Sequence, residues 1–300
     1  MKTGKKQHTI PQFYLNQFVK PGWVYLRSYQ QPKRVKSARS TAVKESFYSQ
    51  DTDEQDYPLD SINTYIEGYT APIFRELLTS QDGLTYENRS LFSFLVANLF
   101  LRSPSTIEEI GNAFLKGLEQ IDYNIKKILE KEEVKVGKDQ PLIKYDTGES
   151  GSSTYTLNEW GKELESMREK SKAGKAMMNE NMSIIADLAP VIARMSWIIL
   201  DAPAGKFFIT SDRPVYLTNL DGSRLHAGWR NPDALASLPL SASRYLILSY
   251  LFPLDTWAYI RASPEKVERL NMRTIASVRY AIYSPGKYPP AESWLHNNSN

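Results

Sequence analysis

Five polar residues in this chain of 300 could together carry out metal-assisted chemistry: His8, Glu45, Glu67, Arg102 and Asp212. The imidazole could ligate a metal or act as a general base near neutral pH. The three carboxylates could supply the hard oxygen ligands that magnesium or manganese prefers. The guanidinium could hold a phosphate through two hydrogen bonds. The set predicts a metal-dependent hydrolase acting on phosphoesters such as nucleic acid.

Each candidate also has a purely structural interpretation. His8 could cap the first helix or bond a backbone carbonyl, and Glu45 could cap a turn. Glu67 and Arg102 could form a buried ion pair between two helices. Asp212 suits an Asx turn between two strands. Under this interpretation the chain is a non-catalytic binding protein, with a phage-borne or defence system as one setting.

A serine hydrolase is a third class to weigh, because Ser211 lies beside Asp212 and His8 could serve as the base. Neighbouring side chains in an extended segment point to opposite faces, so Ser211 and Asp212 would not face the same substrate. The Gly-x-Ser-x-Gly turn that exposes a nucleophilic serine is also absent. We therefore place this class well below the other two.

Composition restricts the partners and the chemistry. With 37 basic and 34 acidic residues the net charge is +3, too weak to indicate nucleic acid by itself. The basic stretch from Lys33 to Arg39, together with exposed tyrosines, could still form a contact surface. The absence of cysteine excludes disulfides, zinc fingers and thiol nucleophiles. Polar residues interrupt the apolar runs at 91–101 and 184–200, so we expect a soluble cytoplasmic protein with no membrane partner.

The pattern of apolar residues predicts an α+β fold. A helical middle is expected to pack on a mostly antiparallel sheet formed by the N-terminal strand and the C-terminal strands. The expected helices are a short one from Pro11, then 61–79, 88–102, 105–133, 157–170, 175–195 and 264–274. The expected strands are 23–29, a hairpin of 197–200 with 207–210, then 215–217, 245–251 and 278–283.

The start of the chain, Gln7 to Phe18, is rich in large apolar residues where many proteins carry a disposable tail. Tyr14, Leu15 and Phe18 fall on one face of the predicted first helix. We therefore expect this face to be core, and the later segments to receive it.

Several motifs, taken in order, resemble one family of uncharacterised bacterial proteins, domain of unknown function 4238. The most specific are His8–Leu15 and Phe208–Val215, with further matches at Ala42–Tyr48 and Leu238–Ser241. The resemblance runs from His8 to about Ser284 and implies a single domain over residues 1–300. The family has no assigned activity, so it implies no reaction. The charged and Gly/Ser-rich stretch 126–153 matches nothing in it, and we interpret that stretch as an exposed helix end followed by a loop insertion.

Overall fold

The structure is a computed structural model that describes residues 6–28, 32–35, 37–45, 58–131, 143–146, 152–156, 159–163, 165–166, 175–223 and 228–298. The chain divides into two compact units: Met1–Thr106 with Asn181–Asn300, and Ile107–Glu180. The first unit has a helical part and strands from both ends of the chain, which confirms the α+β class. Whether the whole chain acts as one domain stays a prediction.

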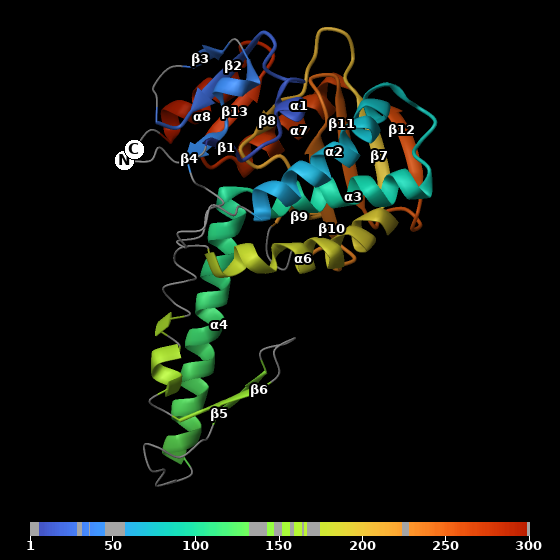
Figure 1. Ribbon diagram of the computed structural model, residues 1–300. Coiled ribbons are helices and arrows are strands. Elements are labelled where there is room, and N and C mark those ends of the chain that lie inside the picture. Colours follow the sequence, from blue (N-terminus) through green and yellow to red (C-terminus); the bar gives the residue numbers. More distant parts are fainter. Residues whose placement is uncertain are drawn as a thin grey trace. The chain divides into compact units, whose positions relative to one another are not determined.

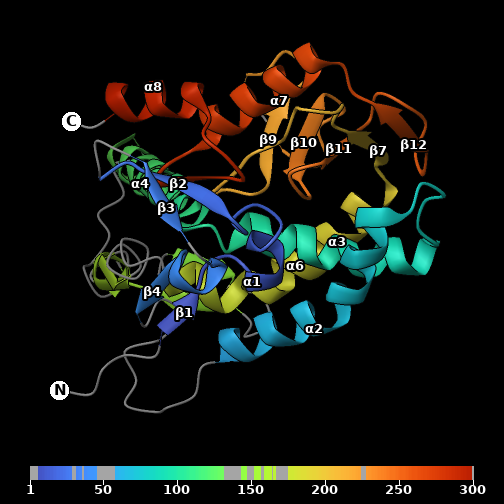
Figure 2. The same ribbon diagram turned by 90° about the horizontal axis from the view of Figure 1, so that it is seen from above.

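Two long helices form the N-terminal half of the first unit. They are α2, Pro58–Thr79, and α3, Tyr86–Leu101, and they lie side by side in both views (Figures 1 and 2). Thr85 caps α3 by accepting a hydrogen bond from the amide of Asn88 at 3.2 Å. Apolar residues occupy nearly every face of α3, which explains its burial at the centre of the unit. Both helices were expected from the sequence, and Pro72 sits inside α2 without ending it.

The C-terminal strands form a five-stranded sheet in the order β12-β7-β11-β10-β9. Their bounds are β7 Ser196–Asp201, β9 Tyr216–Asn219, β10 Ala234–Pro239, β11 Arg244–Ser249 and β12 Trp257–Arg261. All neighbours are antiparallel except β12 and β7. The helix α7, Pro264–Ser277, follows β12, and its Val267 and Leu270 belong to the same core cluster as Ile198, Tyr245 and Ile247.

A second sheet joins the two ends of the chain, in the order β3-β2-β13-β8. Its strands are β2 Gly22–Leu26, β3 Lys33–Val35, β8 Thr210–Ser211 and β13 Ala281–Ser284. Tyr25, Ile209, Ile282 and Ile275 pack together beneath it with Ala291 of α8, Pro289–Asn297. The N-terminal strand thus pairs with a C-terminal one as expected, while the other C-terminal strands make up the separate five-stranded sheet.

The expected hairpin of 197–200 with 207–210 is wrong. β7 pairs with β11 and β12, whereas β8 pairs with β13 in the other sheet. The reason lies in the connecting backbone: the amides of Ala202 and Phe208 donate to the carbonyls of Ser243 and Ala242, both at 2.8 Å. The segment between β7 and β8 is therefore hydrogen-bonded to the turn between β10 and β11. After this segment the chain continues into β8 of the second sheet.

The opening segment is core, as expected. It comprises β1, Lys6–His8, which pairs with β4, Val43–Glu45, and the helix α1, Gln12–Leu15. Tyr14, Leu15 and Phe18 have no exposed surface. Gly22, the first residue of β2, follows this segment where backbones pack closely. An added Cβ would lie 2.6 Å from Val19 Cα and 2.7 Å from the carbonyl oxygen of Ser284. Only glycine permits this close approach.

The second unit contains most of α4, Pro104–Lys131, and the start of α6, Lys175–Arg194. Residues 143–146 and 152–155 form an antiparallel pair, β5 and β6, with Ile143 opposite Tyr155. The sequence predicts an exposed helix end and a loop at 126–153 and no strand, although Ile143–Asp146 alternates apolar and polar residues. Helical residues at 159–163 begin with a capping box, in which Glu159 accepts from the amide of Thr156 and donates its own amide to the Thr156 hydroxyl. The interpretation of 126–153 as an insertion stays a prediction, and its residues 132–142 and 147–151 lie outside the described chain.

Across the described ranges, no helix has both the length and the apolar character needed to cross a membrane.

Candidate functional site

Arg102 lies at the C-terminal end of α3 and is buried with its guanidinium bonded to three protein acceptors. Nη1 donates to Glu67 Oε1 at 2.6 Å and to Asn98 Oδ1 at 3.2 Å. Nη2 donates to the backbone carbonyl of His8 at 2.5 Å. Three of the five predicted site residues, His8, Glu67 and Arg102, therefore meet at one place.

Helical spacing explains this meeting. Asn98 and Arg102 are four residues apart on α3, and Asn63 and Glu67 are four residues apart on α2, so each pair lies on one face of its helix. The two faces oppose each other, since Asn98 Nδ2 also donates to Asn63 Oδ1 at 2.7 Å. This polar ladder joins α2 to α3, and the backbone of β1 closes it at the Arg102 end.

The His8 imidazole is half-buried beside this ladder. Its Nε2 lies 2.6 Å from Gln12 Nε2, which fits a hydrogen bond donated by the glutamine amide. Burial lowers the pKa of His8, against a hydrogen bond with the backbone of Thr41 and the nearby Glu67 carboxylate, which raise it. The imidazole therefore lies between Gln12 and Thr41, in an environment that disfavours its charged form.

Glu45 ends β4, where its backbone is paired with Lys6, two positions along the ladder from the His8–Val43 pair. Its side chain lies outside the part of the chain that the structure describes. Its role as a metal ligand or as a turn cap stays a prediction.

Asp212, directly after β8, points its carboxylate at the turn before β13. Oδ1 accepts hydrogen bonds from three successive amides, Arg279 at 3.2 Å, Tyr280 at 3.0 Å and Ala281 at 3.0 Å. Oδ2 is buried and has no hydrogen-bond partner within the described ranges. Burial raises the pKa of this carboxyl group despite the three amide donors, which lower it.

Asp212 is thus bonded to a different part of the fold from the Arg102 ladder. The connection between them is indirect: the hydroxyl of Ser103, next to Arg102, donates to the Asp212 backbone carbonyl at 3.3 Å. The expected Asx turn at Asp212 is replaced by a turn at Ser211, whose hydroxyl accepts from the Arg213 amide at 3.1 Å and donates to the Arg213 carbonyl at 3.0 Å.

Ser211 is fully buried, and its hydroxyl also lies 3.2 Å from that of Ser277. A serine nucleophile must reach substrate, which this position does not allow. Among the residues that the structure describes, no group of three or more His, Asp or Glu side chains has a geometry suited to a metal ion.

A comparison with known families decides what the chain is related to. The family described as "Protein of unknown function (DUF4238)" matches residues 6–287. The chain belongs to this family. The resemblance expected from the motifs is confirmed over nearly the whole sequence, including the N-terminal and C-terminal segments that form the second sheet. No curated protein and no solved structure matches the chain.

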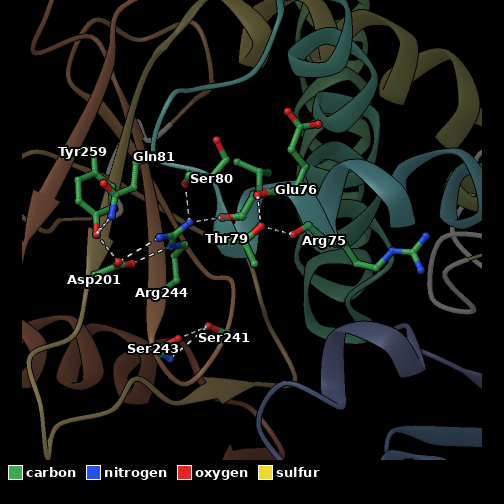
Figure 3. Close-up of polar contacts among 11 residues, drawn as sticks. Arg75, Glu76, Thr79, Ser80, Gln81, Asp201, Ser241, Ser243, Arg244 and Tyr259 are labelled. Atoms are coloured by element: carbon green, nitrogen blue, oxygen red, sulfur yellow. Dashed lines mark hydrogen bonds and ion pairs between the residues drawn. The ribbon is translucent and has the colours of Figure 1, made fainter.

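This DUF4238 protein contains a second polar cluster that the sequence did not indicate (Figure 3). Arg244, at the start of β11, forms a forked ion pair with Asp201, at the end of β7, through Nε to Oδ1 at 2.7 Å and Nη2 to Oδ2 at 3.0 Å. Nη1 donates to the carbonyls of Leu77 and Ser80 at the end of α2, both at 2.7 Å. The Tyr259 hydroxyl donates to Asp201 Oδ2.

The charges in this cluster stabilise each other. Burial opposes ionisation of Asp201, but the hydrogen bonds from Arg244 and Tyr259 outweigh it and hold the pKa of Asp201 below its ordinary value. The hydrogen bonds that Arg244 donates to the Asp201 carboxylate raise the pKa of Arg244. One sequence signal could have found the pair: an aspartate directly after one apolar strand and an arginine directly before another, positions that meet in an antiparallel ladder.

Arg89 on α3 is a further buried cation that the sequence analysis missed. It donates from Nη1 to the carbonyl of Asp255 at 2.9 Å and from Nη2 to that of Met195 at 2.5 Å. Its guanidinium carbon lies 5.3 Å from the centre of the Trp197 ring. Like Arg102 and Arg244, it connects the helices to other elements of the unit through backbone carbonyls.

Proposed function

We propose that this DUF4238 protein is a non-catalytic binding protein whose polar motif residues hold the fold together. The observation that supports this is the state of the Arg102 guanidinium. Its Nη1 and Nη2 donate to Glu67, Asn98 and His8, so holding a substrate phosphate would require breaking those bonds.

The Glu67 carboxylate supports the same proposal. It is the ion-pair partner of a buried cation, and using it as a metal ligand would leave Arg102 buried without its counter-charge. Such a loss is strongly unfavourable inside a protein. The alternative proposal is the metal-dependent phosphoester hydrolase, with magnesium or manganese as cofactor. Its best support is the buried Oδ2 of Asp212, which lacks a hydrogen-bond partner within the described ranges.

One assay separates the two proposals. Wild type, Glu67→Gln and Asp212→Asn would be incubated with single-stranded and double-stranded DNA, RNA and nitrophenyl phosphate, each with magnesium or manganese. We expect no turnover by wild type above the level of the two variants. Metal-dependent turnover by wild type that both folded variants lose would overturn the proposal and establish the hydrolase.

Nucleic acid is the partner that we propose to test first. Arg34 and Arg39 are exposed in the basic stretch, and Tyr65 and Tyr69 on α2 are 64% and 57% exposed with ring centres 4.5 Å apart. Exposed aromatic rings can stack on unpaired bases, and arginines can bind phosphates. We expect a labelled single-stranded oligonucleotide to bind in a salt-sensitive way, more weakly to Arg34→Ala/Arg39→Ala and to Tyr65→Ala/Tyr69→Ala. Fluorescence anisotropy measures this binding. If wild type shows no salt-sensitive binding, nucleic acid is excluded as the partner.

A further inference from the structure

A pocket of about 410 Å³ lies in the first unit, away from both polar clusters. The end of α6 contributes Pro190, Val191 and Arg194, and the segments beside β10 and β11 contribute the rest. The remaining lining residues are Arg230, Pro232, Tyr250 and Leu254. This volume falls in the range of roughly 300–1,000 Å³ that is typical of small-molecule sites.

Two exposed arginines, Arg194 and Arg230, line this pocket. Neither Arg194 nor Arg230 forms an ion pair with any residue that the structure describes. Both guanidinium groups act on the Tyr250 hydroxyl: burial raises the pKa of Tyr250, and the positive charges of Arg230 and Arg194 oppose this. Arg194 and Arg230 line the pocket together with Tyr250, whose hydroxyl donates to the carbonyl of Trp229 at 2.8 Å.

The rest of the pocket is apolar. Two prolines, Val191 and Leu254 complete its lining. Leu251 and Phe252 extend this character into the adjoining loop, since they are 56% and 46% exposed, and Leu254 is 47% exposed. Large apolar side chains gathered beside a cavity indicate a binding surface more often than chance exposure.

We propose that this pocket binds a small organic anion with an apolar body. Arg194 and Arg230 would hold the carboxylate or phosphate group, and the body would lie between Val191, Leu254 and the prolines. A single small molecule is favoured over a protein partner because the two charges and the apolar side chains line one pocket of small-molecule size. This inference rests on the proposed function, in that it treats the protein as a binder and supplies the class of ligand.

The test uses two dyes that differ in charge. Anilinonaphthalene sulfonate is an anion with an apolar aromatic body, and N-phenylnaphthylamine is its neutral analogue. Both become fluorescent in an apolar site. We expect the anionic dye to bind full-length wild type saturably, with one site per chain. We expect Arg194→Ala/Arg230→Ala to bind this dye at least about tenfold more weakly than wild type, because each charge-assisted contact contributes on this scale.

Matched variants separate the pocket from overall charge and from unfolding. Arg75→Ala/Arg269→Ala removes the same charge at exposed positions on α2 and α7, and we expect it to bind the anionic dye as wild type does. Val191→Phe fills the apolar part and should abolish binding while both arginines remain. Near-ultraviolet circular dichroism of each variant excludes the loosely packed states that also bind this dye.

Competition identifies the anionic group. Displacement of the anionic dye by octanoate indicates a carboxylate ligand, and its displacement by phenyl phosphate indicates a phosphate ligand. Octanol, which is neutral, should not displace the anionic dye. The inference is overturned if wild type shows no saturable binding, if the arginine pair can be removed without effect, or if the neutral dye binds as tightly as the anionic one. The proposed function fails differently, through metal-dependent turnover that is lost in Glu67→Gln and Asp212→Asn, so the two failures can be told apart.

Discussion

Arg244 shows how single buried cations organise this protein. Its side chain joins β11 to β7 through Asp201 and to the end of α2 through two backbone carbonyls. Arg244→Met would leave Asp201 without its ion-pair partner and both carbonyls without a donor. We expect a loss of about 3 kcal/mol in the free energy of unfolding, at the low end of the range for broken buried pairs because Asp201 keeps some exposure. Urea denaturation measures it.

The control for this change is Lys206→Met, which breaks an ion pair between two exposed side chains, Lys206 and Glu268. Exposed pairs contribute little to stability, so the control should unfold close to wild type. Equal effects of the two substitutions would mean that the Arg244 network does not hold the sheet to the helix.

Asp212 makes a prediction about pH. Its pKa is raised in the folded protein, so the stability linked to this group is complete below its unfolded value of 3.8 and is lost as pH rises through the folded value. Asp212→Asn keeps an oxygen for the three amides and replaces the unpartnered Oδ2 with a neutral group. We expect this variant to be at least as stable as wild type at pH 7, and its stability to change less between pH 4 and 7.

Asp212→Ala is the matched comparison, because it removes the acceptor of all three amides. It should cost about 1–3 kcal/mol at low pH, the usual penalty for unpaired buried groups, and the cost should fall as pH rises through the folded pKa of Asp212, because wild type then loses the stability linked to this group. If Asp212→Asn instead lost stability at pH 7 as Asp212→Ala does, the carboxylate would be ionised and held as a charge. Denaturant unfolding at a series of pH values distinguishes these outcomes.

At the scale of elements, sequence periodicity predicted the helices well and the strands less well. Apolar residues at helical spacing predicted α2, α3, α6 and α7. This spacing arises because each helix buries one or more faces against its neighbours, and it can be read from the local sequence. β10 and β12 were missed. β10 is buried along its whole length and contains a proline and a serine, and β12 is only partly buried, so neither shows a clean alternation.

The candidate site was predictable only in part, for the same reason. Two i, i+4 pairs on separate helices brought Glu67 and Arg102 together, and that spacing can be read from the sequence. Which residues of β7 and β11 meet depends on strand pairing between distant segments, so the positions of Asp201 and Arg244 beside apolar strands suggest a pair that only the fold can assign. The destination of Asp212 likewise depended on β8 joining β13 rather than β7.

Tyr14 of α1 connects three segments and gives a prediction at this scale. Its hydroxyl donates to the Pro239 carbonyl of β10 at 2.7 Å and lies 2.7 Å from the Thr210 hydroxyl of β8, which donates to it. Tyr14→Phe removes the acceptor of one group and the donor to the other, inside a fully buried site. We expect a loss of about 1–3 kcal/mol in the free energy of unfolding.

Tyr245→Phe is the matched control. Tyr245 is as deeply buried, and the Ser237 and Thr274 side chains approach its hydroxyl without a hydrogen bond of ordinary geometry in the part of the chain that the structure describes. Because an unpaired buried hydroxyl costs free energy in the folded state, Tyr245→Phe should leave the free energy of unfolding unchanged or raise it. An equal loss in both variants would show that the effect comes from removing any buried tyrosine hydroxyl rather than from the three-segment contact.

At the scale of the whole molecule, the first unit is closed by elements from opposite ends of the chain. β2 pairs with β13, and β13 also pairs with β8. The amides that bind Asp212 come from the two residues before β13 and from its first residue, Ala281. Such pairings form only after long stretches of chain have been ordered, so folding of this unit depends on its last strand.

Shortening the chain from its C-terminus tests this dependence. Ending the chain after Tyr280 removes β13 and α8, which leaves β2 and β8 without their shared partner, and we expect no cooperative thermal transition by circular dichroism. Ending it after Gly286 removes α8 alone and keeps both ladders. Truncation after Gly286 exposes the surface covered by Ala291 and Leu295. This shorter protein should therefore still melt cooperatively, but at a lower temperature than wild type. A cooperative transition near that of wild type after loss of β13 would contradict the closure of this unit by its two ends.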